Sequence, residues 1–124
     1  MDAIRILLVD DDARIREALH DLLVDAGFEI VGAAENAREA IDMAERLRPD
    51  VVVMDIQLPG MSGIDATREV LSRVPTTKVI VLSAYADEAL VSGARDAGAI
   101  HYIVKGTPPV QICDTIRRIA GDES

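Results

Sequence analysis

The sequence ILLVDDD at residues 6–12 runs from four apolar residues straight into three carboxylates. An unbroken apolar run, as opposed to an alternating one, is typical of a strand that is buried on both faces. The acidic residues at its end need an explanation, because two unit charges 4 Å apart repel by roughly 4 kcal/mol at an effective dielectric constant of 20. Either a positive group offsets this repulsion or most of the cluster faces water.

The same succession of an apolar run and an amphipathic segment repeats along the chain. It predicts strands at 4–9, 28–33, 51–54, 78–82 and 102–104, and helices at 13–26, 36–48, 63–73, 87–96 and 109–120. Asp12, Asn36 and Ser62 stand where helix N-caps are expected. The connections are too short for anything but right-handed βαβ units. The sequence therefore predicts one α/β domain over residues 1–124, with a parallel five-stranded sheet covered by helices on both faces.

The composition limits the possible functions. A net charge of −9 disfavours direct binding to a nucleic-acid backbone and is compatible with cation binding. The single cysteine, Cys113, excludes an internal disulfide, fits a reducing compartment and is predicted to be a small core residue of the last helix. No apolar run approaches the ~20 residues of a membrane span, and no basic segment precedes the first strand. We therefore expect a cytoplasmic protein without a membrane segment or a signal peptide.

Polar residues end four of the predicted strands: Asp10 with Asp11, then Asp55, Ser83 and Lys105. In an open α/β sheet the ligand crevice lies beyond the carboxyl ends of the strands. Clustered carboxylates without histidine or thiol suit a hard cation such as Mg²⁺. Lysine and serine suit phosphoryl oxygens, and a carboxylate can itself be the nucleophile. The set suggests Mg²⁺-dependent phosphoryl transfer onto an aspartate, and Asp55 stands alone on its loop.

Four ordered motifs add a family resemblance. They are LLVDDDARIREAL at 7–19, PDVVVMDIQLPGMSGID at 49–65, VIVLSAY at 79–85 and AGAIHYIVKG at 97–106. With these motifs the chain resembles the receiver domain of two-component response regulators, and the middle and last motifs are similar to the NarL/FixJ branch. The resemblance implies a flavodoxin-like, doubly wound (βα)5 sheet with strand order 2-1-3-4-5. That order brings Asp10, Asp11 and Asp55 together where the strand order reverses.

The resemblance also implies roles in phosphoryl transfer. Asp55 would accept the phosphoryl group from a sensor histidine kinase or a phosphotransfer protein. Magnesium would be bound directly by Asp11, mainly through water by Asp10, by the backbone carbonyl of Gln57 and by Asp55 itself. Lys105 would pair with Asp55 before transfer and with the phosphoryl group after it. Such a domain is a signalling phosphoacceptor with self-phosphorylation and autodephosphorylation activity, and not an enzyme that turns over an external metabolite.

A second group of residues would respond to phosphorylation. In the family, the hydroxyl at the position of Ser83 moves to bond a phosphoryl oxygen, and the aromatic residue at the position of Tyr102 turns inward behind it. The side chains two positions after the phosphoacceptor and after the switch hydroxyl tune dephosphorylation. These are Gln57 and Tyr85 here, so we expect changes in them to alter the lifetime of the phosphorylated state.

Interaction surfaces and alternative functions remain open at this level. The apolar residues of the last helix cover more than one stripe. Either one stripe packs on the sheet and the rest is edge contact, or helix four, strand five and helix five form a phosphorylation-dependent homodimer face. Residues 1–124 hold no helix-turn-helix segment, so we expect DNA binding only through an output domain outside them, unless the receiver acts on its own.

Parts of the sequence pattern are compatible with two other functions. Asp10-x-Asp12 is similar to the haloacid-dehalogenase phosphatase pattern, although Arg14 stands where that pattern has threonine or valine, no cap domain is present and Asp55 would have no role. The second alternative is a pseudo-receiver used only for dimerisation, against which the complete acidic set argues.

Overall fold

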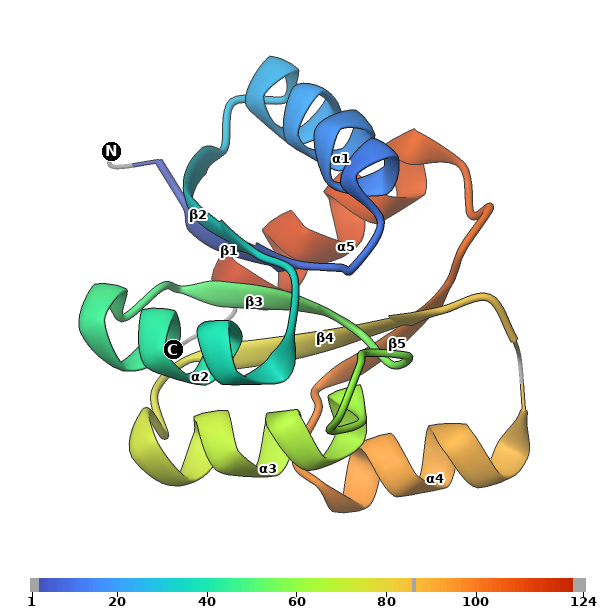
Figure 1. Ribbon diagram of the computed structural model, residues 1–124. Coiled ribbons are helices and arrows are strands. Elements are labelled where there is room, and N and C mark those ends of the chain that lie inside the picture. Colours follow the sequence, from blue (N-terminus) through green and yellow to red (C-terminus); the bar gives the residue numbers. More distant parts are fainter. Residues whose placement is uncertain (1–2, 86, 122–124) are drawn as a thin grey trace.

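Five strands alternate with five helices in the computed structural model, which describes residues 3–85 and 87–121 (Figure 1). The strands are β1 (Arg5–Val9), β2 (Glu29–Ala34), β3 (Val51–Asp55), β4 (Lys78–Ser83) and β5 (His101–Val104). The helices are α1 (Ala13–Asp25), α2 (Ala37–Leu47), α3 (Gly63–Arg73), α4 (Glu88–Asp96) and α5 (Pro109–Gly121). The predicted alternation is confirmed. Within the described residues, none of the helices is long and apolar enough to cross a membrane.

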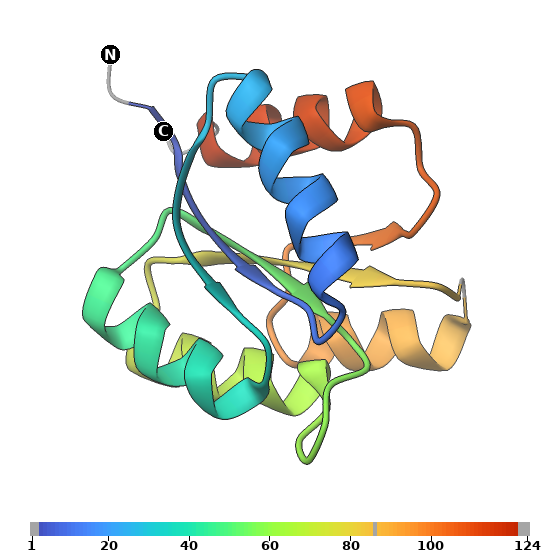
Figure 2. The ribbon, with the colours of Figure 1, turned by 45° about the horizontal axis from the view of Figure 1, so that its top comes forward.

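The strands form one parallel sheet in the order β2-β1-β3-β4-β5, which is the flavodoxin-like arrangement expected from the sequence (Figure 2). β1 and β3 are neighbours, and Val9 pairs with Met54 near the carboxyl ends of both strands. The strand order reverses between them, since β1 is followed outward by β2 and β3 by β4. The residues that come next, Asp10 and Asp55, therefore leave the sheet side by side in the crevice where such folds bind ligands.

Helices cover both faces of the sheet, with α1 and α5 on one and α2, α3 and α4 on the other (Figures 1 and 2). Alternate residues of β1 enter the two cores: Ile6 and Leu8 pack with α1 and α5, while Leu7 and Val9 pack with the other three helices. This two-sided burial explains why the central strands are apolar at every position between their ends. Within α5 the buried stripe faces the sheet and includes Cys113, as predicted.

The three predicted N-caps are confirmed, and each fixes the start of a helix that follows a strand. In each of them a side-chain oxygen accepts a hydrogen bond from a backbone amide of the first turn: Asp12 from Arg14 (2.9 Å), Asn36 from Glu39 (2.9 Å) and Ser62 from Asp65 (3.2 Å). These bonds satisfy amides that have no partner within the helix. Asp12 is thereby committed to α1, next to the acidic pair that precedes it.

The predicted element ends are correct to within one residue, which is the usual spread between assignments. One of these differences has a clear physical cause. The strand predicted from position 28 begins at Glu29 because Phe28 completes the end of α1. Gly27 adopts a φ of 98°, which lets the amide of Phe28 donate a hydrogen bond to the carbonyl of Leu23 (3.0 Å). The ring of Phe28 is then buried in the core beneath α1 and α5.

The amino-terminal edge of the sheet is held by long cationic side chains. Arg5 donates from its two terminal nitrogens to the carbonyls of Leu47 and Arg48, both at 2.9 Å, and so caps the end of α2 from the first residue of β1. Lys78, the first residue of β4, donates to the carbonyl of Ile119 near the end of α5 (2.8 Å). Each bond places a positive charge at a helix C-terminus, where the helix dipole favours it.

The loop after β3 is anchored by a close approach of two backbones. The amide of Gly63, the first residue of α3, donates to the carbonyl of Ile56 (2.8 Å). A Cβ atom at position 63 would lie 2.1 Å from the carbonyl oxygen of Asp55, so only glycine fits without movement of the chain. The start of α3 is thus pressed against the backbone that carries the Asp55 side chain.

Gly63→Ala should therefore destabilise the domain, by about 1–3 kcal/mol if the loop adapts as overpacked sites usually do. Urea unfolding monitored by circular dichroism would measure the loss. Gly121→Ala is the matched control, because a Cβ at that position of α5 meets nothing within 4 Å. Equal stabilities for the two variants would contradict the close approach.

Candidate functional site

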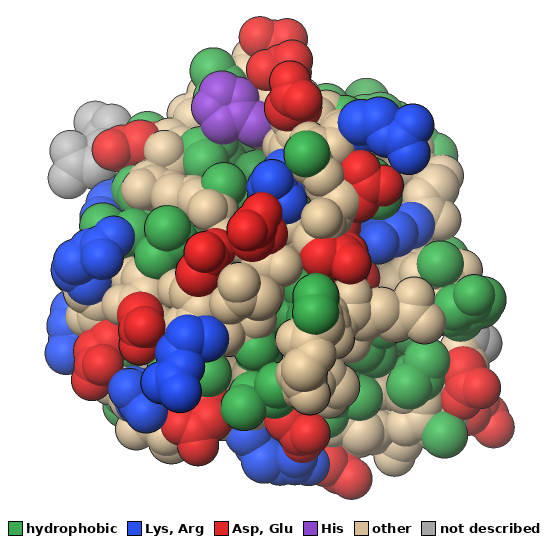
Figure 3. Space-filling model, viewed as in Figure 1, with side chains coloured by type: hydrophobic (Ala, Val, Ile, Leu, Met, Phe, Trp, Pro, Cys, Tyr) green, Lys and Arg blue, Asp and Glu red, His purple; other side chains and the backbone are tan. Residues whose placement is uncertain are grey.

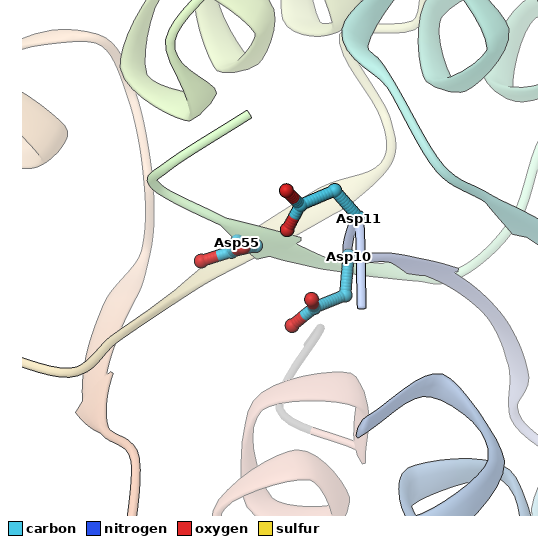
Figure 4. Close-up of side chains that lie close together, drawn as sticks. All are labelled: Asp10, Asp11 and Asp55. Carbon is cyan, nitrogen blue, oxygen red and sulfur yellow. The ribbon is translucent and has the colours of Figure 1, made fainter. Parts of the chain in front are cut away.

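Three carboxylates converge at the carboxyl ends of β1 and β3 (Figure 4). Asp10 and Asp11 follow β1 directly, and Asp55 is the last residue of β3. One oxygen from each of the three lies within 4.8 Å of the others. Asp10 and Asp55 are almost fully buried, at 2% and 3% exposure, whereas Asp11 is exposed. The convergence expected for these residues is confirmed.

Lys105 supplies a positive charge to this cluster from the residue after β5. Its Nζ atom lies 3.2 Å from Oδ1 of Asp55 and 3.3 Å from Oδ2 of Asp10. Partial burial of the lysine lowers its pKa, but the attraction of Asp55 and Asp10 outweighs this effect, and the pKa is raised overall. Lys105 is therefore charged at neutral pH and bridges the two buried carboxylates. One positive charge then faces three negative ones.

This arrangement of charges disfavours the ionised form of Asp55. Its pKa is raised above the ordinary value of 3.8, first because burial removes water from the carboxylate and second because Asp10 repels it. Lys105 and the amide of Gln57, which donates to Oδ1 of Asp55 at 3.3 Å, offset only part of this effect. The fold therefore makes the ionised form of Asp55 less favourable than it is in water.

Asp10 and Asp11 differ in whether their carboxylate oxygens already have partners in the protein. Oδ1 of Asp10 accepts a hydrogen bond from the amide of Asp12 (2.9 Å). Oδ2 lies near Lys105, yet no hydrogen bond from the described residues reaches it. The side chain of Asp11 makes no hydrogen bond or ion pair with any residue of 3–85 or 87–121. Asp11 thus has both carboxylate oxygens without a partner among the described residues, whereas Oδ1 of Asp10 accepts a hydrogen bond and its Oδ2 forms an ion pair with Lys105.

This donor set fits a small hard cation. All three groups offer oxygen, the ligand atom that Mg²⁺ prefers, and the cluster contains no histidine or thiol. The buried Oδ2 of Asp10 lacks a hydrogen-bond donor, and such an atom is costly unless a cation or a water molecule satisfies it. An acidic triad with these properties is typical of a magnesium site.

The hydroxyl and aromatic residues singled out by sequence lie on the neighbouring strands. Ser83 ends β4 and is fully buried, and its Oγ atom accepts a hydrogen bond from the amide of Tyr85 (3.2 Å). Tyr102 on β5 donates its hydroxyl proton to the backbone carbonyl of Tyr85 (2.7 Å). The backbone of Tyr85 thus connects Ser83 beside the acidic cluster to Tyr102 at the sheet edge. The Tyr85 side chain itself is 57% exposed.

Sequence reasoning missed one residue of the site. Arg16 on α1 donates from Nη1 to the backbone carbonyl of Asp10 at 2.6 Å, and its Nη2 lies 3.8 Å from Oε2 of Glu35, the residue after β2. A usable signal existed, because Arg16 shares a helical stripe with Leu19 and Leu23, and a charged residue on an apolar stripe calls for a partner.

Comparison with known proteins identifies the family. The sequence profile of the response regulator receiver domain matches residues 6–117. The chain belongs to this family. Receiver domains are signalling phosphoacceptors and not enzymes in the usual sense, and Asp10, Asp11, Asp55 and Lys105 form the acidic pocket of this one.

Similar proteins fall into more than one functional group. The chemotaxis protein CheY of Thermotoga maritima is 41% identical over 116 residues, which cover 94% of this receiver domain and 97% of CheY. The transcriptional regulatory protein PdtaR of Mycobacterium tuberculosis is 43% identical over 115 residues, or 93% of this chain, and the match spans 54% of PdtaR. The receiver domain thus covers about half the length of the curated transcriptional regulators it matches.

A solved structure supports the same assignment. The CheX–CheY–BeF3–Mg²⁺ complex of Borrelia burgdorferi contains a chain that superposes with a TM-score of 0.89 at 26% identity, over 94% of this receiver domain and 88% of that chain. Relatives among both chemotaxis proteins and transcriptional regulators establish the family without assigning its branch. The phosphatase alternative built on Asp10-x-Asp12 was wrong, since Asp12 is the N-cap of α1 and the family is that of receivers.

The electrostatics of Asp55 can be tested through stability. Because the pKa of Asp55 is raised in the folded state, its ionised form destabilises the fold above pH 3.8, and protonation removes that penalty as the pH falls through the raised pKa. We expect Asp55→Asn to raise the melting temperature at pH 7 in a chelator, with a gain that shrinks toward pH 4.

Thermal unfolding between pH 4 and 8 would measure this difference. Asp42→Asn serves as the matched control, because it removes the same charge from an exposed position of α2. A lower melting temperature for Asp55→Asn than for the wild type at pH 7 would show that the carboxylate is not under electrostatic stress.

Proposed function

We propose that this receiver domain accepts a phosphoryl group on Asp55 from a sensor histidine kinase or a phosphotransfer protein. An oxygen of the Asp55 carboxylate attacks phosphorus, and the bond from phosphorus to the donor nitrogen breaks as the aspartyl phosphate forms. The observation that carries the proposal is the position of Asp55. It is a buried carboxylate, in contact with Lys105 and with two further carboxylates that can hold a cation.

Each residue around Asp55 has a proposed role that the geometry supports. Asp11, with both oxygens free, would bind Mg²⁺ directly, and Asp10, already bonded to Asp12, would bind it mainly through water. Asp55 and the backbone carbonyl of Gln57 would complete the protein ligands. When bound, Mg²⁺ supplies positive charge that neutralises the phosphoryl oxygens and the acidic cluster.

Lys105 would hold Asp55 before transfer and a phosphoryl oxygen after it. Phosphoryl transfer needs little more from the protein than such positioning and charge neutralisation.

Phosphorylation would then alter the strand ends next to the site. Ser83 follows Leu82, which pairs with Asp55 in the sheet, and its hydroxyl would move toward a phosphoryl oxygen and break its bond to the amide of Tyr85. Tyr102, whose hydroxyl is bonded to the carbonyl of Tyr85, would turn inward in response. One local change of charge thereby biases a two-state element at the surface.

Partners and cellular context extend this proposal. A face of α4, β5 and α5 would mediate homodimerisation, for which the 71% exposure of Val110 on α5 offers an apolar contact. The acidic and basic side chains spread over the surface in Figure 3, with a net charge of −9, argue against direct DNA binding by this domain. DNA would be reached only through an output domain outside residues 1–124, as in the NarL/FixJ branch. The place of action would be the cytoplasm, with residues 1–124 as one receiver domain.

Incubation with acetyl phosphate and Mg²⁺ tests the phosphoacceptor role without a kinase. Intact-mass spectrometry should show the addition of one phosphoryl group, and peptide mapping should place it on Asp55. Asp55→Asn and a chelator should each abolish the addition, whereas Asp42→Asn should leave it unchanged. Phosphoryl transfer that persists in Asp55→Asn would refute Asp55 as the acceptor, and so would no transfer to the wild type from any donor.

The lifetime of the phosphorylated form tests Gln57 and Tyr85. In this proposal the side chains of Gln57, two residues after the acceptor, and of Tyr85, two residues after Ser83, limit the approach of water, so Gln57→Ala and Tyr85→Ala should each shorten the half-life. The decay of the phosphorylated mass after removal of acetyl phosphate measures it. Unchanged half-lives in both variants would remove these residues from the proposal.

A further inference from the structure

Arg16 joins two strand ends to α1 at the edge of the acidic site. Its side chain is only 20% exposed, although most of the first half of α1 faces solvent. One guanidinium nitrogen donates to the carbonyl of Asp10 at 2.6 Å, and another lies 3.8 Å from Glu35 just beyond β2. A planar guanidinium with several donors can make both contacts at once, which the single ammonium of a lysine cannot do in the same geometry.

The carbonyl that Arg16 holds belongs to the peptide unit between Asp10 and Asp11. The rest of Asp10 is also fixed, since its amide donates to the carbonyl of Ala34 (3.1 Å) and its carboxylate accepts from the amide of Asp12 (2.9 Å). With both sides of Asp10 held, the bond to Arg16 sets the plane of the peptide that leads into Asp11. The direction of the Asp11 side chain follows from this plane.

Asp11 depends on that plane more than its neighbours do. Its side chain has no hydrogen bond or ion pair with the rest of the described chain, so packing does not orient its carboxylate. Figure 4 shows the carboxylates of Asp10, Asp11 and Asp55 gathered around one space, which requires Asp11 to leave the backbone in one direction. The backbone must supply this orientation.

We infer that Arg16 is a positioning residue of the cation site, which orients the carboxylate of Asp11 through the peptide between Asp10 and Asp11. This inference rests on the proposed function, because it concerns the same Mg²⁺ site. Arg16 touches neither the phosphoryl group nor the cation. Partners that orient metal ligands in this way typically change metal affinity 10- to 100-fold when they are removed.

The sign of the effect separates positioning from simple electrostatics. A positive charge near three carboxylates repels a cation, so the removal of Arg16 as a mere charge would tighten Mg²⁺ binding. Removal of Arg16 as a positioning group lets the peptide turn and weakens binding. The two roles of the same side chain therefore predict opposite changes in the dissociation constant.

A titration with Mg²⁺ followed by NMR of the ¹⁵N-labelled domain tests the inference, with no phosphoryl donor present. We expect Arg16→Met to raise the dissociation constant about tenfold or more, with the amide resonances of Asp11 and Asp12 displaced before Mg²⁺ is added. Arg16→Lys keeps the charge but not the planar guanidinium, so its dissociation constant should lie between those of the wild type and Arg16→Met. Arg14→Met is the matched control, because it removes the same charge from a side chain that is 91% exposed and pairs with Asp12, not with Asp10.

The outcomes distinguish this inference from the proposed function. If the wild type binds no Mg²⁺, or if Asp11→Ala binds it as well as the wild type, the proposed site itself fails. If the wild type binds and Arg16→Met binds equally or more tightly, only the role of Arg16 is overturned. Loss of affinity in Arg14→Met to the same degree would also overturn it.

A purely structural role of Arg16 is excluded by a second measurement. In the acetyl phosphate reaction, Arg16→Met should raise the Mg²⁺ concentration for half-maximal rate about tenfold, while the rate at saturating Mg²⁺ changes little. A global loss of folding would lower the maximal rate instead. If Arg16→Met does not fold, Arg16→Lys gives the same test, and wild-type affinity in that variant overturns the inference.

Discussion

Repulsion between three carboxylates at the ends of two neighbouring buried strands is the constraint on which the rest of the site depends. A parallel sheet delivers the ends of β1 and β3 to one place, and the buried Asp10 and Asp55 cannot turn away into water. Lys105 and backbone amides offset part of this negative charge, but the site remains negatively charged. The raised pKa of Asp55 shows that charge stress remains in the folded state. A bound cation would relieve that stress and would also offset the negative charge that a phosphoryl group brings to Asp55.

In the proposed switch, a change at Asp55 would reach the surface through the strand ends beside it. Ser83 is fully buried at the end of the strand next to β3. Its hydroxyl accepts a hydrogen bond from the amide of Tyr85, and the carbonyl of Tyr85 accepts one from the hydroxyl of Tyr102. The route from the buried site to the sheet edge is thus two hydrogen bonds that share one residue. So short a connection needs no large rearrangement of the core.

The sequence predicted the fold well because its signals are local. Apolar runs, N-caps at Asp12, Asn36 and Ser62 and short connections determine a right-handed parallel sheet almost on their own. The acidic cluster was predictable for the same reason, since each carboxylate ends a strand. The strand order came only with the family resemblance, because periodicity does not say which strands are neighbours. The exact start of β2 and the partner of Arg16 were missed, since each depends on a single hydrogen bond that apolar periodicity does not show.

The two ends of the strands differ in how their charges are paired, and this difference separates stability from reactivity. At the amino-terminal edge, Arg5 and Lys78 place cations on helix ends, and each charge there meets a partner of the opposite polarity. At the carboxyl-terminal edge like charges meet instead. Because the strands are rigid and parallel, the end with paired charges can stabilise the sheet while the end with repelling carboxylates remains able to bind a ligand. Substitutions at Arg5 or Lys78 would then lower the stability of the domain, whereas loss of a carboxylate at the acidic edge would impair signalling and relieve repulsion in the fold. Stability should therefore limit which substitutions are tolerated at the amino-terminal ends of the five strands, and signalling should limit them at the carboxyl-terminal ends.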